Sequence, residues 1–173
     1  MLFRSLICLI AVGFATGCFS YDANRFYVLS GVEQKHAYNW TCAANQEISA
    51  KKADWATATT VEETIKDEVY QSGLLNLQVG KPYIVRVINE DDKTRTFRAP
   101  DLFASSSVLK VIHEGKEIIA PCLEAVAVGP KSASEIHLVP LEVGYYDYHE
   151  TILKIPHLTE ITTNGSVGLA YVY

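Results

Sequence analysis

Apolar and polar residues alternate along short stretches from about residue 74 onward, a pattern typical of half-buried β-strands. Ile136 and Leu138 fall on one face of an extended strand, and Tyr146 and Tyr148 do so in the next one. Glycine and proline interrupt the pattern roughly every ten residues, as turns do between short strands. The chain is therefore predicted to be an all-β sandwich or barrel. The expected strands cover residues 74–79, 83–89, 94–98, 109–113, 116–119, 123–128, 134–140, 144–149 and 168–173.

Three further segments and one residue are predicted individually. Residues 61–70 suit a helix or a strand, and their charge alone favours a helix. Residues 101–107 are expected to form a short helix or an irregular loop. The acidic residues 90–92 are predicted to be a solvated turn rather than a calcium site. His137 alternates away from the apolar face of its strand, so its side chain is expected to be exposed.

The first eighteen residues differ from the rest of the chain. Arg4 precedes an apolar run at 6–14, and small residues follow up to Gly17. This order predicts a secretory signal peptide at residues 1–17, and the run is too short for a permanent transmembrane helix. Gly17-Cys18 also resembles a bacterial lipobox, so ordinary cleavage and lipidation at Cys18 both stay open. We expect an exported protein, either in the bacterial periplasm or as a lipoprotein held at the membrane by Cys18 alone.

Charge and cysteine content narrow the picture further. The net charge of −5, without a basic cluster, argues against nucleic acid or anionic lipid as a partner. Cys42 and Cys122 would both lie in an oxidising compartment, where paired thiols usually form a disulfide. A Cys42–Cys122 disulfide is therefore expected, with two separate buried thiols as the alternative. Residues 18–57 are predicted to be an N-terminal extension before a domain at residues 58–173.

Four motifs occur in a characteristic order within that domain. They are V-G-K-P-Y at 79–83 with the strand that follows, T-F-R-A-P-D-L-F at 96–103, V-G-P-K at 128–131 with the strand at 136–140, and G-Y-Y-D-Y at 144–148. In this order they resemble the cupredoxins, the plastocyanin and azurin family of small copper proteins. The resemblance covers about residues 58–173. It implies a Greek-key β-sandwich and favours a strand over a helix for residues 61–70.

A type-1 copper site needs two histidines, a cysteine thiolate and a weak axial methionine. The resemblance places Arg95 at the first histidine and Glu150 at the cysteine. His157 lies two residues beyond the place of the second histidine. Ser166 falls near the axial position, because no methionine follows Met1. The thiolate that a blue-copper electron carrier requires is therefore missing, and no such carrier is expected.

Two functions stay open. In the first, the protein is an envelope protein without a cofactor, whose domain is a binding or structural module for an envelope partner. In the second, it binds copper or another transition metal through a rebuilt site of His149, Glu150 and His157, since imidazole and carboxylate groups suit Cu(II) and Zn(II). Without such a site, His149 is a solvent-facing strand end and His157 belongs to a long loop. The sequence holds no nucleophile elbow, zinc-binding helix or phosphate loop, so an enzyme is not expected.

Overall fold

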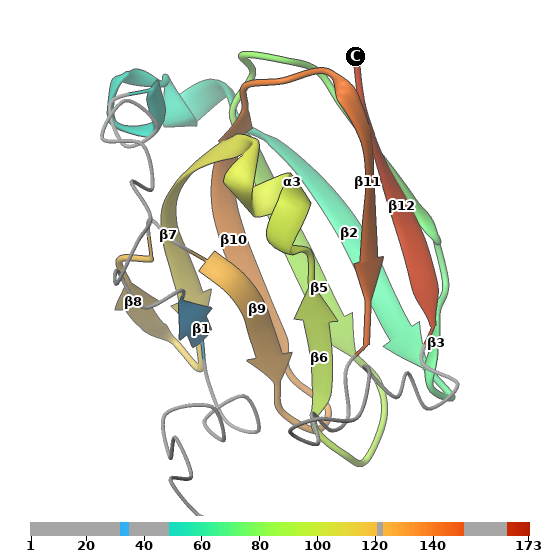
Figure 1. Ribbon diagram of the computed structural model, residues 1–173. Coiled ribbons are helices and arrows are strands. Elements are labelled where there is room, and N and C mark those ends of the chain that lie inside the picture. Colours follow the sequence, from blue (N-terminus) through green and yellow to red (C-terminus); the bar gives the residue numbers. More distant parts are fainter. Residues whose placement is uncertain (1–31, 35–48, 121–122, 151–165) are drawn as a thin grey trace, which may run out of the picture.

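The computed structural model describes residues 32–34, 49–120, 123–150 and 166–173 (Figure 1). These residues form two six-stranded β-sheets that share one hydrophobic core. Short helices accompany the sheets, among them the 3₁₀ helix η3 (Trp55–Thr57) and the α-helix α3 (Pro100–Ala104); residues 49–52 are helical as well. The expected all-β sandwich is therefore confirmed.

Each sheet combines strands from distant parts of the chain. Sheet A contains, in spatial order, β1 (Val32–Gln34), β9 (Leu123–Val128), β6 (Arg95–Arg98), β11 (Gly144–His149), β12 (Val167–Val172) and β4 (Leu74–Leu77). Sheet B contains β3 (Val69–Tyr70), β2 (Thr59–Lys66), β5 (Tyr83–Asn89), β10 (Ala133–Pro140), β7 (Ser106–His113) and β8 (Lys116–Ile118). β2 pairs with β5 and β4 with β12 in parallel, and the other paired strands that the structure describes are antiparallel.

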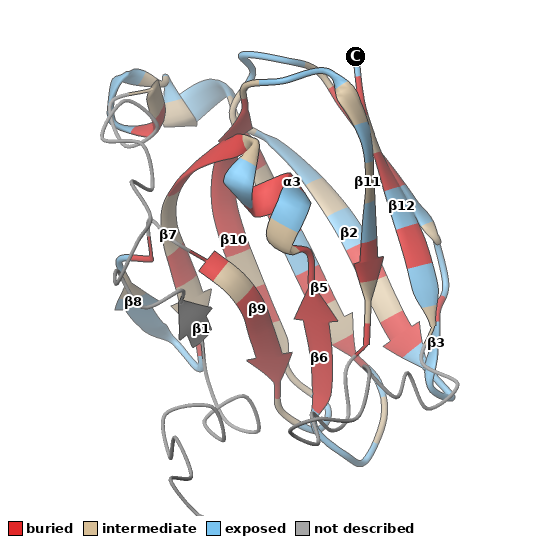
Figure 2. Ribbon diagram, in the orientation of Figure 1, coloured by how far each residue is buried: buried red, intermediate tan, exposed pale blue. Residues whose placement is uncertain are grey.

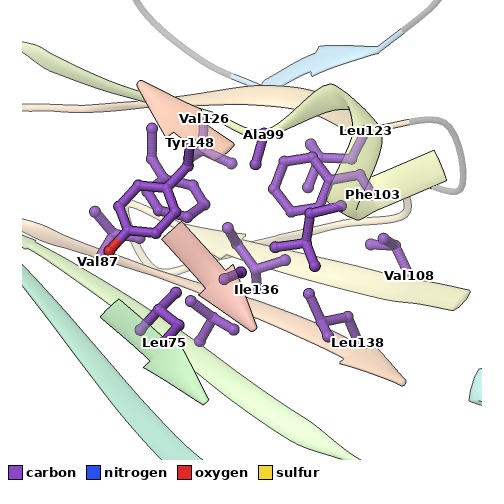
Figure 3. Packing of buried hydrophobic residues seen from close by; sticks show 14 of the residues in the cluster. Leu75, Val87, Ala99, Phe103, Val108, Leu123, Val126, Ile136, Leu138 and Tyr148 are labelled. Atoms are coloured by element: carbon purple, nitrogen blue, oxygen red, sulfur yellow. The ribbon is translucent and has the colours of Figure 1, made fainter. Parts of the chain in front are cut away.

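The core lies between the two sheets, where the inward positions of the alternating strands meet. Buried positions follow every second residue in β4, β5 and β12, as the sequence pattern requires (Figure 2). Ile136 and Leu138 of β10 face Tyr148 of β11 across this space (Figure 3). Burying each such side chain contributes about 1.5–3 kcal/mol, so the core is the main source of stability.

The segments that the sequence left open are now assigned. Residues 61–70 contain β2 and β3, so the strand favoured by the cupredoxin resemblance is confirmed. α3 occupies the start of residues 101–107, and it packs against β7, β9 and β11. The strands expected at residues 109–113 and 116–119 form a hairpin, because β7 and β8 pair directly on either side of Glu114 and Gly115.

Two predictions about exposure are wrong. The prediction of an exposed His137 fails because Trp55 packs against its ring, and only 9% of the residue is exposed. The prediction of a solvated turn at residues 90–92 holds for Glu90 and Asp92, which are exposed, and fails for Asp91, whose side chain is 11% exposed and pairs with Arg95. Trp55 lies on a different element from His137, and Arg95 lies beyond the turn that contains Asp91. The alternation of residues along one strand cannot predict such contacts.

Part of the N-terminal extension packs on the sandwich. Val32–Gln34 pairs with β9 at the edge of sheet A, and the N–H of Ala50 donates to Ser107 Oγ over 2.9 Å. Among the described residues, no helix is long and apolar enough to cross a membrane. Cys18, Cys42 and Cys122 lie outside the described residues, so the lipid anchor and the disulfide stay predictions.

Candidate functional site

Three of the positions at which the resemblance places copper ligands lie at one end of the sandwich. Arg95 begins β6, Glu150 directly follows β11 and Ser166 directly precedes β12. The start of β6, the end of β11 and the start of β12 lie toward the lower end of the molecule in Figure 1. The N–H of Glu150 donates to the carbonyl oxygen of Ser166 over 3.2 Å. His157 lies outside the described residues.

Arg95 binds three carboxylates at once. Its Nε donates to Asp91 over 2.7 Å, its Nη2 to Glu68 over 2.8 Å and its Nη1 to Glu150 over 3.2 Å. The side chains of Arg95 and Glu150 are only 6% and 2% exposed. We call these four residues the Arg95 cluster. A planar guanidinium with donors in a fixed fork suits such a geometry, whereas the point charge of a lysine would not.

Asp91 extends the Arg95 cluster to the backbone of sheet B. Its two carboxylate oxygens accept the N–H groups of Asp67 and Glu68 over 2.7 and 3.0 Å. Asp67 and Glu68 form the turn between β2 and β3 and have φ values of 53° and 67°, which non-glycine residues seldom adopt. Asp91 therefore holds this turn in place while it also binds Arg95.

The electrostatics follow from this geometry. Burial by itself would raise the pKa of Asp91, but the N–H groups of Glu68 and Asp67 and the guanidinium lower it below the ordinary value of 3.8. The hydrogen bond and the charge of Arg95 also lower the pKa of Glu68. Burial would lower the pKa of Arg95, but hydrogen bonds and charges of the carboxylates raise it overall. Arg95 therefore carries its positive charge permanently.

Glu150 has the opposite environment. Burial raises the pKa of its carboxyl group, and the charge and hydrogen bond of Arg95 offset only part of that effect. Its Oε2 atom is buried and has no hydrogen-bond partner among the residues that the structure describes. Glu150 is thus a costly residue to bury, and Arg95 is what makes its burial tolerable.

The described residues do not fit a type-1 copper centre. A permanently charged guanidinium offers no lone pair to a metal, and here it stands where the resemblance expects an imidazole. In place of the thiolate stands Glu150, already engaged by Arg95. Within the described residues, no group of three histidine, cysteine, aspartate or glutamate side chains could hold a metal ion.

The structure does not bring His149 and Glu150 together. His149 is the last residue of β11 and Glu150 directly follows it, and the two side chains have different partners. His149 Nδ1 lies 3.4 Å from Asp147 Oδ2 on the outer face, whereas Glu150 binds Arg95 inside. Because His157 lies outside the described residues, the rebuilt metal site of these three residues stays a prediction.

A second buried polar group was not foreseen from the sequence. Tyr148 donates a short hydrogen bond to Glu63 Oε2, and Glu63 is fully buried on β2. The Glu63 carboxylate also accepts the N–H groups of Ser72 and Gly73. The only hint in the sequence is a tyrosine at an inward position, because a buried hydroxyl needs an acceptor. Burial, with Glu63 beside it, raises the pKa of Tyr148 well above its ordinary range.

Comparison with known proteins returned solved structures only. No protein-family model and no curated protein sequence matches this chain. It is similar to a mutant of amicyanin at 17% identity, over 72% of this chain and 89% of that one, with a TM-score of 0.38. For auracyanin B the identity is 12%, the coverage 67% and 89%, and the TM-score 0.46. For a multicopper oxidase from Campylobacter jejuni the identity is 14%, over 66% of this chain and 29% of that one, and the TM-score is 0.41. All three are cupredoxin-fold proteins, and likenesses this distant concern the fold and not the metal site.

Proposed function

We propose that this chain is an exported cell-envelope protein whose cupredoxin-like domain acts as a binding or structural module without a type-1 copper centre. The observation that carries the proposal is the buried ion pair between Arg95 and Glu150. These are the two positions at which the sequence resemblance expects a histidine and the cysteine of a blue-copper site. Arg95 and Glu150 bind each other instead of a metal ion.

The charge of the site supports the same conclusion. A copper ion placed beside Arg95 would meet a fixed positive charge, and Glu150 would have to leave its partner to bind the metal. Arg95 would then keep Asp91 and Glu68 but lose the most deeply buried of its three carboxylate partners. A metal ion that binds here would therefore have to break the Arg95–Glu150 ion pair.

The export part of the proposal comes from the sequence of residues 1–18. A basic residue, a short apolar run and small residues before Cys18 support a secretory signal with either ordinary cleavage or a lipid anchor. A contact role is supported by the outer face of β11 and β12, where Tyr145 stacks on Tyr171 at 4.7 Å and remains 71% exposed. Exposed apolar groups that gather on one face often mark contacts with other molecules.

A copper titration of the mature protein tests the proposal. Calorimetry and visible absorption are recorded together on protein freed of metal by chelation. We expect no stoichiometric, tight binding of Cu(II) and no intense blue band. An intense blue band would mean that a thiolate binds copper, and the proposal would be wrong.

Histidine variants test the one remaining outcome of the titration. Tight binding with pale absorption would contradict the proposal in favour of the histidine–carboxylate alternative. In that case His157→Ala and His149→Ala should each weaken binding. His113→Ala is the matched control, because His113 lies on the β7–β8 hairpin and bonds Ser134 over 2.9 Å.

A further inference from the structure

Residues 49–57 lie across the outer face of sheet B, and we call them the Trp55 strap. Ile136 and Leu138 of β10 point into the core, so His137 between them points outward, where the ring of Trp55 covers it. The two ring centroids are 5.3 Å apart. Ala50, at the other end of the strap, is fully buried.

Two hydrogen bonds and the contact of Trp55 with His137 help to hold the Trp55 strap in place. The N–H of Ala50 donates to Ser107 Oγ of β7, and the indole N–H of Trp55 donates back to the carbonyl oxygen of Ala50, each over 2.9 Å. The second bond folds the strap on itself and leaves the Trp55 ring against His137. The imidazole of His137 is therefore part of the surface on which the strap docks.

His137 sits in surroundings suited to its neutral form. It is 9% exposed, and its Nε2 atom is buried without a hydrogen-bond partner among the described residues. A proton added to the ring would bring a charge into a site that the strap keeps from water. The cost of that desolvation falls on the docked form only, because release of the strap returns the ring to solvent.

The charged neighbours of His137 come from three strands. Lys110 of β7 lies directly opposite it in the strand register and binds Glu117 of β8 over 2.7 Å. Glu135 of β10 lies 3.8 Å from Nε2. The residue opposite on β5 is Ile84, which carries no charge. Burial, with Lys110 added to it, lowers the pKa of His137 below the ordinary 6.5, and Glu135 and Glu117 offset only part of this.

The strap brings its own charged residues to this face. They are Lys51, Lys52 and Asp54, and the carboxylate of Asp54 accepts the N–H of Ala56 at the start of η3. Asp54 thus caps its own helix.

We propose that protonation of His137 releases the Trp55 strap from sheet B, so that acidification uncovers the outer face of β7 and β10. Above pH 6.5 both the docked and the released forms hold a neutral imidazole, and docking does not change with pH. As the pH falls below 6.5, the released form takes up the proton first. The docking equilibrium constant then falls by up to tenfold per pH unit, until the pKa of the docked form is reached.

Tryptophan fluorescence measures the release. The chain has two tryptophans, so Trp40→Phe leaves Trp55 as the single reporter. Between pH 7.5 and 5 we expect the Trp55 emission to shift to longer wavelength with a midpoint below 6.5, and the exchange of the Ala50 amide hydrogen to accelerate at least tenfold relative to β10 amides. Far-UV circular dichroism should stay constant, since only the strap moves.

Two variants make the test specific. His137→Phe keeps an aromatic ring under Trp55 but cannot take up a proton, so its emission should not change over this range. His113→Gln is the control and should keep the transition, because His113 lies outside the strap contact. The proposal is overturned if the parent emission does not change, if the transition persists in His137→Phe, or if it coincides with loss of the β-sheet signal.

Discussion

At the residue scale, the ring of Tyr148 lies over Gly168 and leaves no room for a side chain there. Gly168 pairs with Tyr148 across β11 and β12, and a Cβ at Gly168 would lie 2.1 Å from two carbons of that ring. Tyr148 cannot simply turn aside. Its hydroxyl is bound to Glu63, and its ring packs 4.9 Å from both Phe97 and Tyr70. The absence of a side chain at Gly168 is therefore a packing requirement.

Gly168→Ala should lower the free energy of unfolding by about 2 kcal/mol, because the added methyl group displaces a ring held at both ends. Urea unfolding followed by circular dichroism measures the loss. Gly129→Ala is the control and should cost far less, since its Cβ would meet the movable Ser132 hydroxyl at 3.3 Å and the Glu114 carboxylate at an ordinary 3.8 Å. Equal losses in the two variants would show that Tyr148 yields freely.

At the scale of elements, strand alternation predicted most of the strands, and the reason is local. Hydrophobic positions two apart, ended by glycine or proline, place β5, β10 and β11 within a residue or so of the observed bounds. Residues 61–70 were ambiguous because charged residues line the exposed face of β2. The resemblance to cupredoxins decided that segment, not the alternation.

The contacts of the site could not be predicted in the same way. Arg95 and Glu150 are 55 residues apart, and Arg95 and Glu68 are 27 apart, so no window of sequence contains the pair. The resemblance marked Arg95 and Glu150 as departures from a ligand set, yet it did not indicate that they bind each other. The burial of His137 depends likewise on Trp55, which lies on a different element.

The hairpin of β7 and β8 offers a prediction at this scale. Glu114 and Gly115 have φ values of 50° and 73°, the left-handed conformation that two-residue hairpin turns require. Glu114→Asn should raise the free energy of unfolding by about 0.5 kcal/mol, since asparagine tolerates this conformation better than glutamate does. Thermal unfolding provides the measurement. Glu117→Asn, within β8, is the control and should bring no gain; a loss of stability in Glu114→Asn would contradict the turn assignment.

At the scale of the whole molecule, the Arg95 cluster joins the two sheets. Arg95 and Glu150 belong to the end of sheet A, while Glu68 lies in the β2–β3 turn of sheet B. Asp91 adds the loop after β5 and fixes the backbone of the same turn. One guanidinium thus links four segments at one end of the sandwich.

Arg95→Met should destabilise the protein by about 3–5 kcal/mol, because it leaves Glu150 buried without its counter-charge. Urea unfolding at neutral pH checks this. The matched control is Arg86→Met: Arg86 pairs with Glu62 over 3.1 Å on the surface, and loss of such a pair costs about 0–1 kcal/mol.

The double variant Arg95→Met, Glu150→Leu keeps the test open should the single variant fail to fold. Replacing both members of a buried pair by apolar groups removes the uncompensated charge, so most of the lost stability should return. If the double variant is no more stable than Arg95→Met, the cost of the substitution lies in the turn and not in Glu150.

The place of β12 has a consequence for the order of folding. It lies between β11 and β4 in sheet A, and its parallel pairing joins Leu74 to Leu169. Among the described strands β4 pairs with β12 alone, so it stays unpaired until the chain has been made as far as Val172. Such long-range pairing places the chain among the slower folders, on a scale of milliseconds to seconds. During synthesis, the edge of β4 that pairs with β12 stays without its hydrogen bonds until β12 has been made.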